Sequence, residues 1–155
     1  MAAKWMPTIL VCEADEGVQE AFRLLLEDWA TAQVVPDTTE CLNALRQSPV
    51  ELLILDLDGQ GIEPLEVLTT IRATYPTLKV LLVAGGFTLD FQLAALKRSP
   101  ISFLTKPFNP KATVEKIQTL VGYATSLVRR RSIVRVVVST VGSGITDVTT
   151  SDDPP

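Results

Sequence analysis

The stretch Leu52-Leu53-Ile54-Leu55-Asp56-Leu57-Asp58-Gly59 decides the fold of this chain. Its four consecutive large aliphatic residues are too apolar for a half-exposed strand, so they predict a strand buried on both faces, as in parallel sheets. The run ends at the carboxylate of Asp56. In open α/β folds the carboxyl ends of the strands form the edge at which ligands bind. Asp56 is therefore a candidate functional residue, although an Asp-x-Asp-Gly sequence also begins an ordinary turn well.

Strand-like and helix-like segments alternate five times along the chain. The expected strands are 8–12, 33–35, the aliphatic run 52–55, 80–83 and 101–105. The expected helices follow them and begin near Asp15, Thr38 or Thr39, Pro64, Thr88 and Asn109. In the fourth helix the apolar positions are Leu89, Leu93 and Leu96. Such alternation predicts right-handed crossovers between parallel strands, that is, a three-layer, doubly wound α/β domain with a five-stranded parallel sheet.

The composition excludes several classes of function. The chain has 155 residues, of which 46% are hydrophobic and 21% charged, as in globular domains. Residues 1–123 carry ten Lys or Arg against fifteen Asp or Glu, which argues against nucleic acid as the main partner. The absence of His excludes His-dependent acid–base chemistry, His metal ligands and a phosphohistidine carrier.

The sequence predicts a cytoplasmic protein. No signal peptide is recognisable, and no apolar run approaches the roughly 18 residues that a membrane span needs. Cys12 and Cys41 lie in an apolar strand and an apolar helix. They are expected to be small buried hydrophobic residues rather than a disulfide or a redox pair.

Charged residues gather where the expected strands end. Glu13 and Asp15 follow the first strand, Asp56 and Asp58 the third, and Lys106 the fifth. The carboxyl ends of parallel strands share one edge of the sheet, so these residues are expected to converge. Acids together with one Lys form a site able to hold a divalent cation and a phosphoryl group.

Over roughly residues 8–123 these segments resemble the receiver domain of two-component response regulators. The segment 9–15 resembles the family's first strand with its acidic pair, and 57–65 resembles the loop and helix start after the phosphoacceptor, with Gly61 in place. The segment 103–108 is similar to the signature that holds the family's lysine and proline. The resemblance implies a flavodoxin-like (βα)5 receiver fold over residues 1–123.

The resemblance also assigns roles to individual residues. It implies that Asp56 is the phosphoacceptor and that Lys106 is the counter-charge for the phosphoryl group. It implies Mg²⁺ as cofactor, with Glu13, Asp56 and Asp58 as ligands, Asp58 through its carbonyl group. In the same way, Phe103 stands at the position of the family's switch aromatic residue, and Ala84 at that of the switch Ser or Thr.

The sequence departs from the family where the chemistry takes place. Ala14 replaces the acid that ligates Mg²⁺ directly, Ala84 has no hydroxyl for the phosphoryl oxygens, and Gln60 stands where a Pro is usual. Weak Mg²⁺ binding and slow or absent phosphorylation are therefore expected, unless Asp15 or Asp58 replaces the missing ligand. Loss of one carboxylate also relieves repulsion in a metal-free pocket, so Lys106 is expected to pair directly with Asp56.

Three functions are compatible with these residues. The first is a single-domain, non-enzymatic signalling protein phosphorylated by a sensor histidine kinase or a phosphotransfer protein, acting on a downstream protein partner, with a homodimer as one arrangement. The second is a pseudo-receiver that binds its partner without phosphorylation. The third and most remote is a haloacid-dehalogenase-like phosphatase. Residues 54–59 also resemble the nucleophile motif of that family, although Gln60 replaces its Thr.

Residues 124–155 differ in character from the rest. Three Arg residues at 129–131 precede the Val-rich run 133–138, and the end is rich in Gly, Ser, Thr and Asp. One interpretation is an extension of the last helix through Arg131 followed by a flexible tail. The other is a β-prone segment that adds to the sheet edge of a partner.

Overall fold

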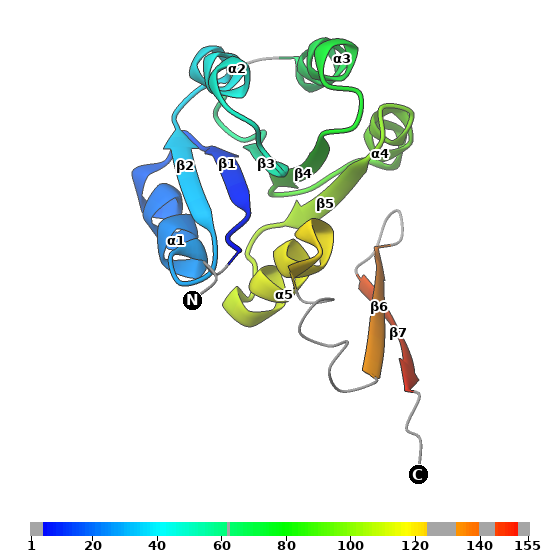
Figure 1. Ribbon diagram of the computed structural model, residues 1–155. Helices are drawn as coiled ribbons and strands as arrows, with labels where there is room; N and C mark the ends of the chain where they lie inside the picture. Colours follow the sequence, from blue (N-terminus) through cyan, green and yellow to red (C-terminus); the bar gives the residue numbers. More distant parts are fainter. Residues whose placement is uncertain (1–4, 62, 124–132, 140–144, 152–155) are drawn as a thin grey trace.

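The computed structural model describes residues 5–61, 63–123, 133–139 and 145–151. Its centre is a five-stranded parallel sheet with the order β2-β1-β3-β4-β5 (Figure 1). The strands are β1 (Thr8–Cys12), β2 (Thr31–Val35), β3 (Leu52–Asp56), β4 (Lys79–Ala84) and β5 (Ile101–Thr105). The predicted α/β architecture with five parallel strands is therefore confirmed.

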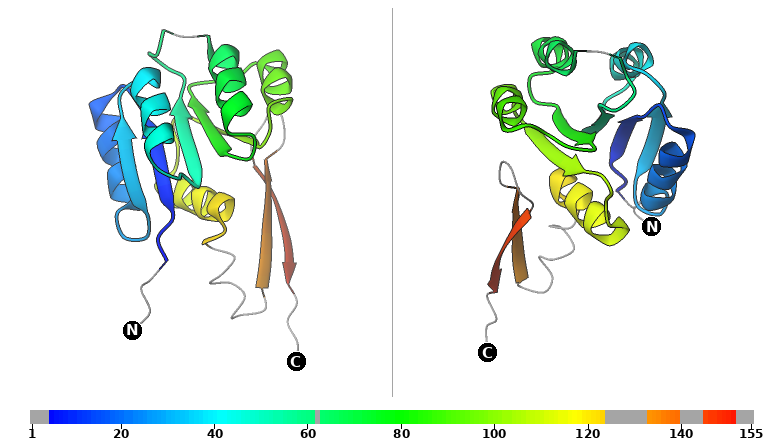
Figure 2. Two further views of the ribbon diagram at one scale, coloured as in Figure 1. Left: turned by 45° about the horizontal axis from the view of Figure 1, so that its top comes forward. Right: turned by 180° about the vertical axis from the view of Figure 1, so that it is seen from behind.

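Five helices cover the two faces of the sheet (Figure 2). They are α1 (Glu16–Leu26), α2 (Thr38–Gln47), α3 (Pro64–Thr74), α4 (Leu89–Leu96) and α5 (Pro110–Val121). Helices α1 and α5 pack on one face, and α2, α3 and α4 pack on the other. Within the described ranges, no helix has both the length and the apolar character that crossing a bilayer requires.

Strand β3 lies between the two hydrophobic layers, which explains its unbroken apolar sequence. Leu53 and Leu55 belong to the layer under α2, α3 and α4, while Leu52 and Ile54 belong to the layer under α1 and α5. Every residue of β3, including Asp56, is buried. A strand with neighbours and helices on both sides leaves no position where a polar residue would meet water.

Most of the helix starts agree with the sequence prediction. Asp15 caps α1, where its Oδ1 accepts a hydrogen bond from the N–H of Val18 at 3.0 Å, and Thr88 and Asn109 cap α4 and α5. The prediction for α2 was wrong by one or two residues, because its cap is Asp37. The Asp37 carboxylate accepts from the N–H of Glu40 at 2.8 Å, and Asp is at least as good a cap as Thr.

Helix α4 presents a different face to the sheet from the one that its leucines suggested. Leu89 and Leu93 are 56% and 50% exposed, whereas Gln92 and Ala95 are buried. Ala95 belongs to the core layer under α2, α3 and α4. The aliphatic pattern of a short, mostly apolar helix does not define one inward stripe, so the packing decided the orientation.

The Val-rich run of the C-terminal part forms a strand, as its β-prone sequence suggested. Strand β6 (Ile133–Ser139) pairs antiparallel with β7 (Ile145–Ser151), so its first partner is a segment of the same chain. Strand β7 was not predicted, because its Thr and Val residues lie among polar ones. The proposed helix extension through Arg131 lies outside the described residues.

The amino-terminal side of the sheet depends on a guanidinium group that the sequence analysis did not single out. Arg72 of α3 donates from Nε to the carbonyl of Arg98 at 2.9 Å and from Nη1 to the carbonyls of Tyr75 and Leu78, both at 2.8 Å. Its Nη2 donates to the carbonyl of Pro100 at 3.2 Å. One side chain thus joins α3 to the loops that precede β4 and β5.

Replacing Arg72 with Ala should lower the free energy of unfolding by about 2–3 kcal/mol, because several partly buried carbonyls lose their donor at once. Urea denaturation followed by circular dichroism measures this change. Arg46→Ala is the matched control: Arg46 is exposed on α2 and should cost less than about 0.5 kcal/mol. Equal losses for the two variants would show that the Arg72 contacts do not stabilise the fold.

Candidate functional site

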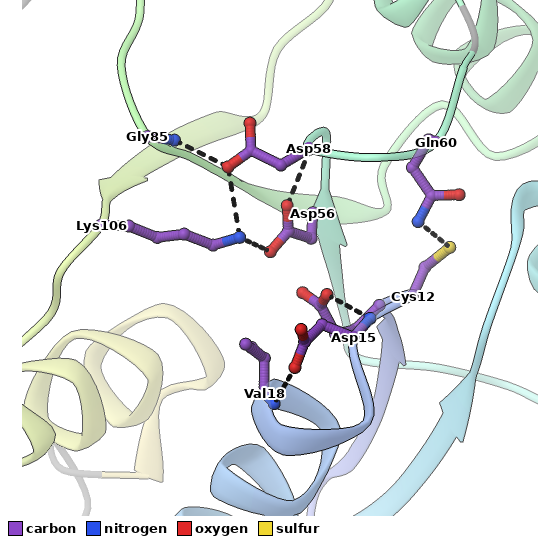
Figure 3. A network of polar contacts seen from close by, with 9 residues as sticks. Cys12, Asp15, Val18, Asp56, Asp58, Gln60, Gly85 and Lys106 are labelled. Atoms are coloured by element: carbon purple, nitrogen blue, oxygen red, sulfur yellow. Dashed lines mark hydrogen bonds and ion pairs between the residues drawn. The ribbon is translucent and has the colours of Figure 1, made fainter.

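Lys106 meets Asp56 and Asp58 at the carboxyl ends of the strands (Figure 3). Glu13 follows β1, Asp56 ends β3, Asp58 lies just beyond it, and Lys106 follows β5. They converge because β1 and β4 flank β3, and β5 flanks β4, all running parallel.

Asp56 and Lys106 form a close ion pair. The distance from Lys106 Nζ to Asp56 Oδ2 is 2.5 Å, and the Asp56 side chain is almost fully buried while that of Lys106 is 24% exposed. The other Asp56 oxygen, Oδ1, accepts from the N–H of Asp58 at 2.8 Å. Burial alone would lower the pKa of Lys106, but the two neighbouring carboxylates outweigh it and raise that pKa. The Lys106 ammonium is therefore charged near neutral pH.

The carboxylate of Asp58 bridges two parts of the site. Its Oδ2 lies 3.2 Å from Lys106 Nζ and accepts from the N–H of Gly85 at 3.0 Å. Gly85 begins the loop after β4, so the bridge connects the loop after β3 to the loop after β4 (Figure 3). From the sequence we expected Asp58 to take part as a metal ligand, through its carbonyl or in place of the missing acid, and did not expect its carboxylate to bridge Lys106 and Gly85. The Asp-x-Asp spacing was the available signal for a second carboxylate.

Glu13 is a buried acid with one oxygen to spare. It is 1% exposed, and its Oε1 accepts from the N–H of Asp15 at 2.9 Å. Its Oε2 is buried and has no hydrogen-bond partner in the described part of the chain. Burial and the adjacent Asp56 carboxylate raise the pKa of Glu13 to about 7, against the opposing effects of the Asp15 N–H and Lys106. The free oxygen is suited to a cation or a proton.

The carboxylates fit a cation site only in part. The Oδ1 of Asp15 caps α1. Among the described residues, no group of three acidic, Cys or His side chains is placed to hold a metal ion. Glu13 and Asp56 remain as a pair of carboxylates. Two carboxylates are sufficient for Mg²⁺ when water and substrate oxygens complete its octahedral shell.

The two switch positions are both well packed. Ala84 is buried at the end of β4, and its carbonyl accepts from the N–H of Lys106 at 2.9 Å. Phe103 is half-buried, and its ring meets Phe87 edge-on with a centroid distance of 5.1 Å. The aromatic residue is thus held under the β4–α4 loop, and Ala84 offers that loop no side-chain hydroxyl.

Comparison with known proteins gives one family. A family model described as the response regulator receiver domain matches residues 9–118. The DNA-binding response regulator MtrA of Mycobacterium tuberculosis is 32% identical over 112 residues, which are 71% of this chain and 48% of that protein. An NtrX-like response regulator of Rickettsia bellii is 28% identical over 104 residues, 65% of this chain and 22% of that protein. The chain therefore spans between about a fifth and a half of these curated relatives.

Solved structures share the fold at low sequence identity. A response regulator from Thermotoga maritima has a TM-score of 0.69 at 22% identity, covering 76% of this chain and 99% of that one. The chemotaxis response regulator CheY4 of Vibrio cholerae has a TM-score of 0.68 at 17% identity, covering 75% of this chain and 99% of that one. The likeness covers the five-stranded part of the chain and shows the fold alone.

The raised pKa of Glu13 predicts a pH-dependent stability. An acid whose pKa rises from 4.5 when unfolded to about 7 when folded binds more protons in the folded state. The destabilisation of the folded state by Glu13 therefore grows as the pH rises from 4.5 to 7 and is constant above 7. Glu13→Gln should remove it, so the variant should gain up to roughly 3 kcal/mol relative to the unmodified protein between pH 4.5 and pH 8.

Urea unfolding of both proteins at several pH values without added divalent cation measures this difference. Glu40→Gln on the exposed side of α2 removes one carboxylate away from the pocket and serves as control. A pH-independent difference between Glu13→Gln and the unmodified protein would contradict the raised pKa.

Proposed function

Because this chain belongs to the response regulator receiver domain family, we propose that it is a signalling protein that receives a phosphoryl group on Asp56. Receiver domains are signalling modules, and the observation that supports Asp56 is its position. It is a buried carboxylate at the end of the central strand, in contact with the one lysine of the pocket. We place the receiver unit at residues 1–123 and treat 124–155 as a separate extension that contains the β6–β7 hairpin.

The chemistry proposed for the pocket is nucleophilic attack by a carboxylate oxygen. An oxygen of Asp56 forms a bond to the phosphorus of the donor, and the bond to the leaving group breaks with its electron pair on that group. The product is an acyl phosphate at Asp56. Lys106 offsets the negative charge that builds up on the phosphoryl oxygens, because its ammonium group already lies 2.5 Å from Asp56 Oδ2.

Receiver domains typically bind Mg²⁺ at the phosphorylation site, and we propose that Glu13 and Asp56 would hold it here, with the Asp58 carbonyl as a weaker third ligand. The unpartnered Oε2 of Glu13 supports this assignment. The ion supplies neutralisation of charge on the transferring group when it is bound. Ala14 contributes no carboxylate, so the affinity should be low.

The partners proposed for this protein are other proteins. A sensor histidine kinase or a phosphotransfer protein would be the phosphodonor, and a downstream protein or a second copy of the chain would read the outcome. The matching part of the MtrA sequence is about half of that DNA-binding protein. The fifteen acids against ten basic residues in 1–123 favour protein over nucleic acid as the partner of this unit. The buried free thiols of Cys12 and Cys41 agree with a reducing compartment such as the cytoplasm.

A second candidate is a pseudo-receiver that acts without phosphorylation. The observation in its favour is that Lys106 already pairs with two carboxylates, while Ala14 and Ala84 lack the groups that would favour phosphoryl transfer. Family membership leaves the remote phosphatase alternative without a supporting observation. The two remaining candidates differ in one property, the reactivity of Asp56.

Incubation with Mg²⁺ and acetyl phosphate should add one phosphoryl group to the protein, detected as a gain in intact mass, at a rate at least tenfold lower than for a receiver with a complete acidic pair. Asp56→Asn should show no gain, because an amide cannot act as the nucleophile. Asp28→Asn, an exposed acid beyond α1, should react like the unmodified protein. A folded protein that shows no gain at any Mg²⁺ concentration would establish the pseudo-receiver instead.

Restoring the missing acid should raise the affinity for Mg²⁺. Ala14 is exposed directly after the buried Glu13, and Ala14→Asp would place a further carboxylate beside the pocket. We expect the dissociation constant, measured by isothermal titration calorimetry, to fall at least tenfold. Ala14→Asn adds a side chain of the same shape without the charge and should change it little. An unchanged constant for Ala14→Asp would show that Ala14 does not limit metal binding.

A further inference from the structure

The carboxylate of Asp58 occupies a position that the function proposed above leaves unexplained. A phosphoryl group on Asp56 would place negatively charged oxygens next to the end of the Asp56 side chain. Two groups suited to receive them are the ammonium of Lys106 and the N–H of Gly85, and both already contact Asp58 Oδ2. We propose that Asp58 is a built-in competitor for the phosphoryl group, an anion that fills the phosphoryl position until the group displaces it.

The distances place Asp58 at the anion position itself. Lys106 Nζ lies 2.5 Å from Asp56 Oδ2 and 3.2 Å from Asp58 Oδ2, so one ammonium group holds both carboxylates. The Asp58 N–H in turn donates to Asp56 Oδ1 at 2.8 Å, which keeps residue 58 beside residue 56 (Figure 3). An oxygen of a phosphoryl group on Asp56 would therefore approach Lys106 at the position where the Asp58 oxygen already lies.

The Gly85 N–H strengthens this interpretation. Gly85 follows Ala84, the position where the resemblance places a hydroxyl that would contact phosphoryl oxygens. With no hydroxyl there, the backbone N–H of Gly85 is a donor that the β4–α4 loop supplies to the pocket, and Asp58 accepts from it at 3.0 Å. The same carboxylate oxygen thus takes a charged donor and a neutral one, as a phosphoryl oxygen would.

The charges of the pocket explain why the Asp58 carboxylate must move away before a phosphoryl group can occupy this position. Lys106 carries one positive charge against the carboxylates of Asp56 and Asp58, with Glu13 beside Asp56. A further dianionic group would compete for the same ammonium and repel Asp58. Because the Asp58 side chain is 51% exposed, it can turn into water without opening the core.

A simpler alternative is that Asp58 only staples the two loops together. The loop after β3 is also shaped by Gly59 and Gly61, whose φ angles are +73° and +63°. A staple and a competitor predict opposite effects of removing the carboxylate. Loss of a staple disorganises the donors and weakens anion binding, whereas loss of a competitor frees them and strengthens it.

The test compares the unmodified protein with Asp58→Ala and Asp58→Asn, and with Asp28→Asn as a control for the change in net charge. Inorganic phosphate is titrated into ¹⁵N-labelled protein, and the amide signal of Gly85 reports occupancy. We expect phosphate to bind Asp58→Ala at least tenfold more tightly than the unmodified protein. Asp58→Asn should follow Asp58→Ala, because it keeps the shape but loses the charge, and Asp28→Asn should match the unmodified protein.

A second readout separates this proposal from the phosphoacceptor role on which it rests. Acetyl phosphate with Mg²⁺ should label Asp58→Ala at least tenfold faster than the unmodified protein. If no variant is labelled, Asp56 is not a phosphoacceptor, and the phosphate titration still decides whether Asp58 blocks the anion position. Equal phosphate responses at Gly85 in the unmodified protein and Asp58→Ala, including no response in either, or weaker binding by Asp58→Ala, would overturn the proposal.

Discussion

The pocket depends on the ion pair between Lys106 and Asp56. Asp56 lies at the end of a strand that is buried on both faces, where an isolated carboxylate would be costly to keep ionised. The ammonium group at 2.5 Å offsets that cost, and the backbone N–H of Asp58 satisfies the second oxygen. The burial of the Asp56 carboxylate thus depends on a contact between residues fifty positions apart.

The scaffold around this pair is well packed because β3 has a hydrophobic layer on both sides. Its aliphatic residues point alternately into the layer under α1 and α5 and the layer under α2, α3 and α4. The carboxyl ends of β1, β3 and β5 are held in register by the neighbouring strands. The site is therefore built from the ends of strands that are hydrogen-bonded into one sheet.

Two alanines set this pocket apart from the pattern that its family resemblance implies. Ala14 leaves Glu13 and Asp56 as the principal acids, and Ala84 leaves a backbone N–H, that of Gly85, in place of a hydroxyl. Lys106 contacts the carboxylates of Asp56 and Asp58 at the same time. Lys106 therefore has two carboxylate partners before any ligand arrives.

Much of the fold could be predicted from local patterns. The apolar run 52–55, the caps at Asp15, Thr88 and Asn109, and the alternation of strands and helices were sufficient for the sheet and its helices. The orientation of α4 and the role of Arg72 could not be predicted. Leu89 and Leu93 are as apolar as core residues, and the carbonyls that Arg72 binds belong to loops that approach one another only in the folded chain.

The same division holds for the site. The sequence by itself determined which residues would gather, because the residues that follow parallel strands in one sheet share an edge. It also determined that Ala stands at positions 14 and 84, where the family resemblance implies an acid and a hydroxyl, since residue identity is read directly from the sequence. Only the tertiary structure decided that Oε2 of Glu13 has no hydrogen-bond partner among the described residues and that Asp58 joins Lys106 to Gly85. The reason is that hydrogen bonds and charge pairing depend on distances of a few ångströms between loops, which no pattern along the chain encodes.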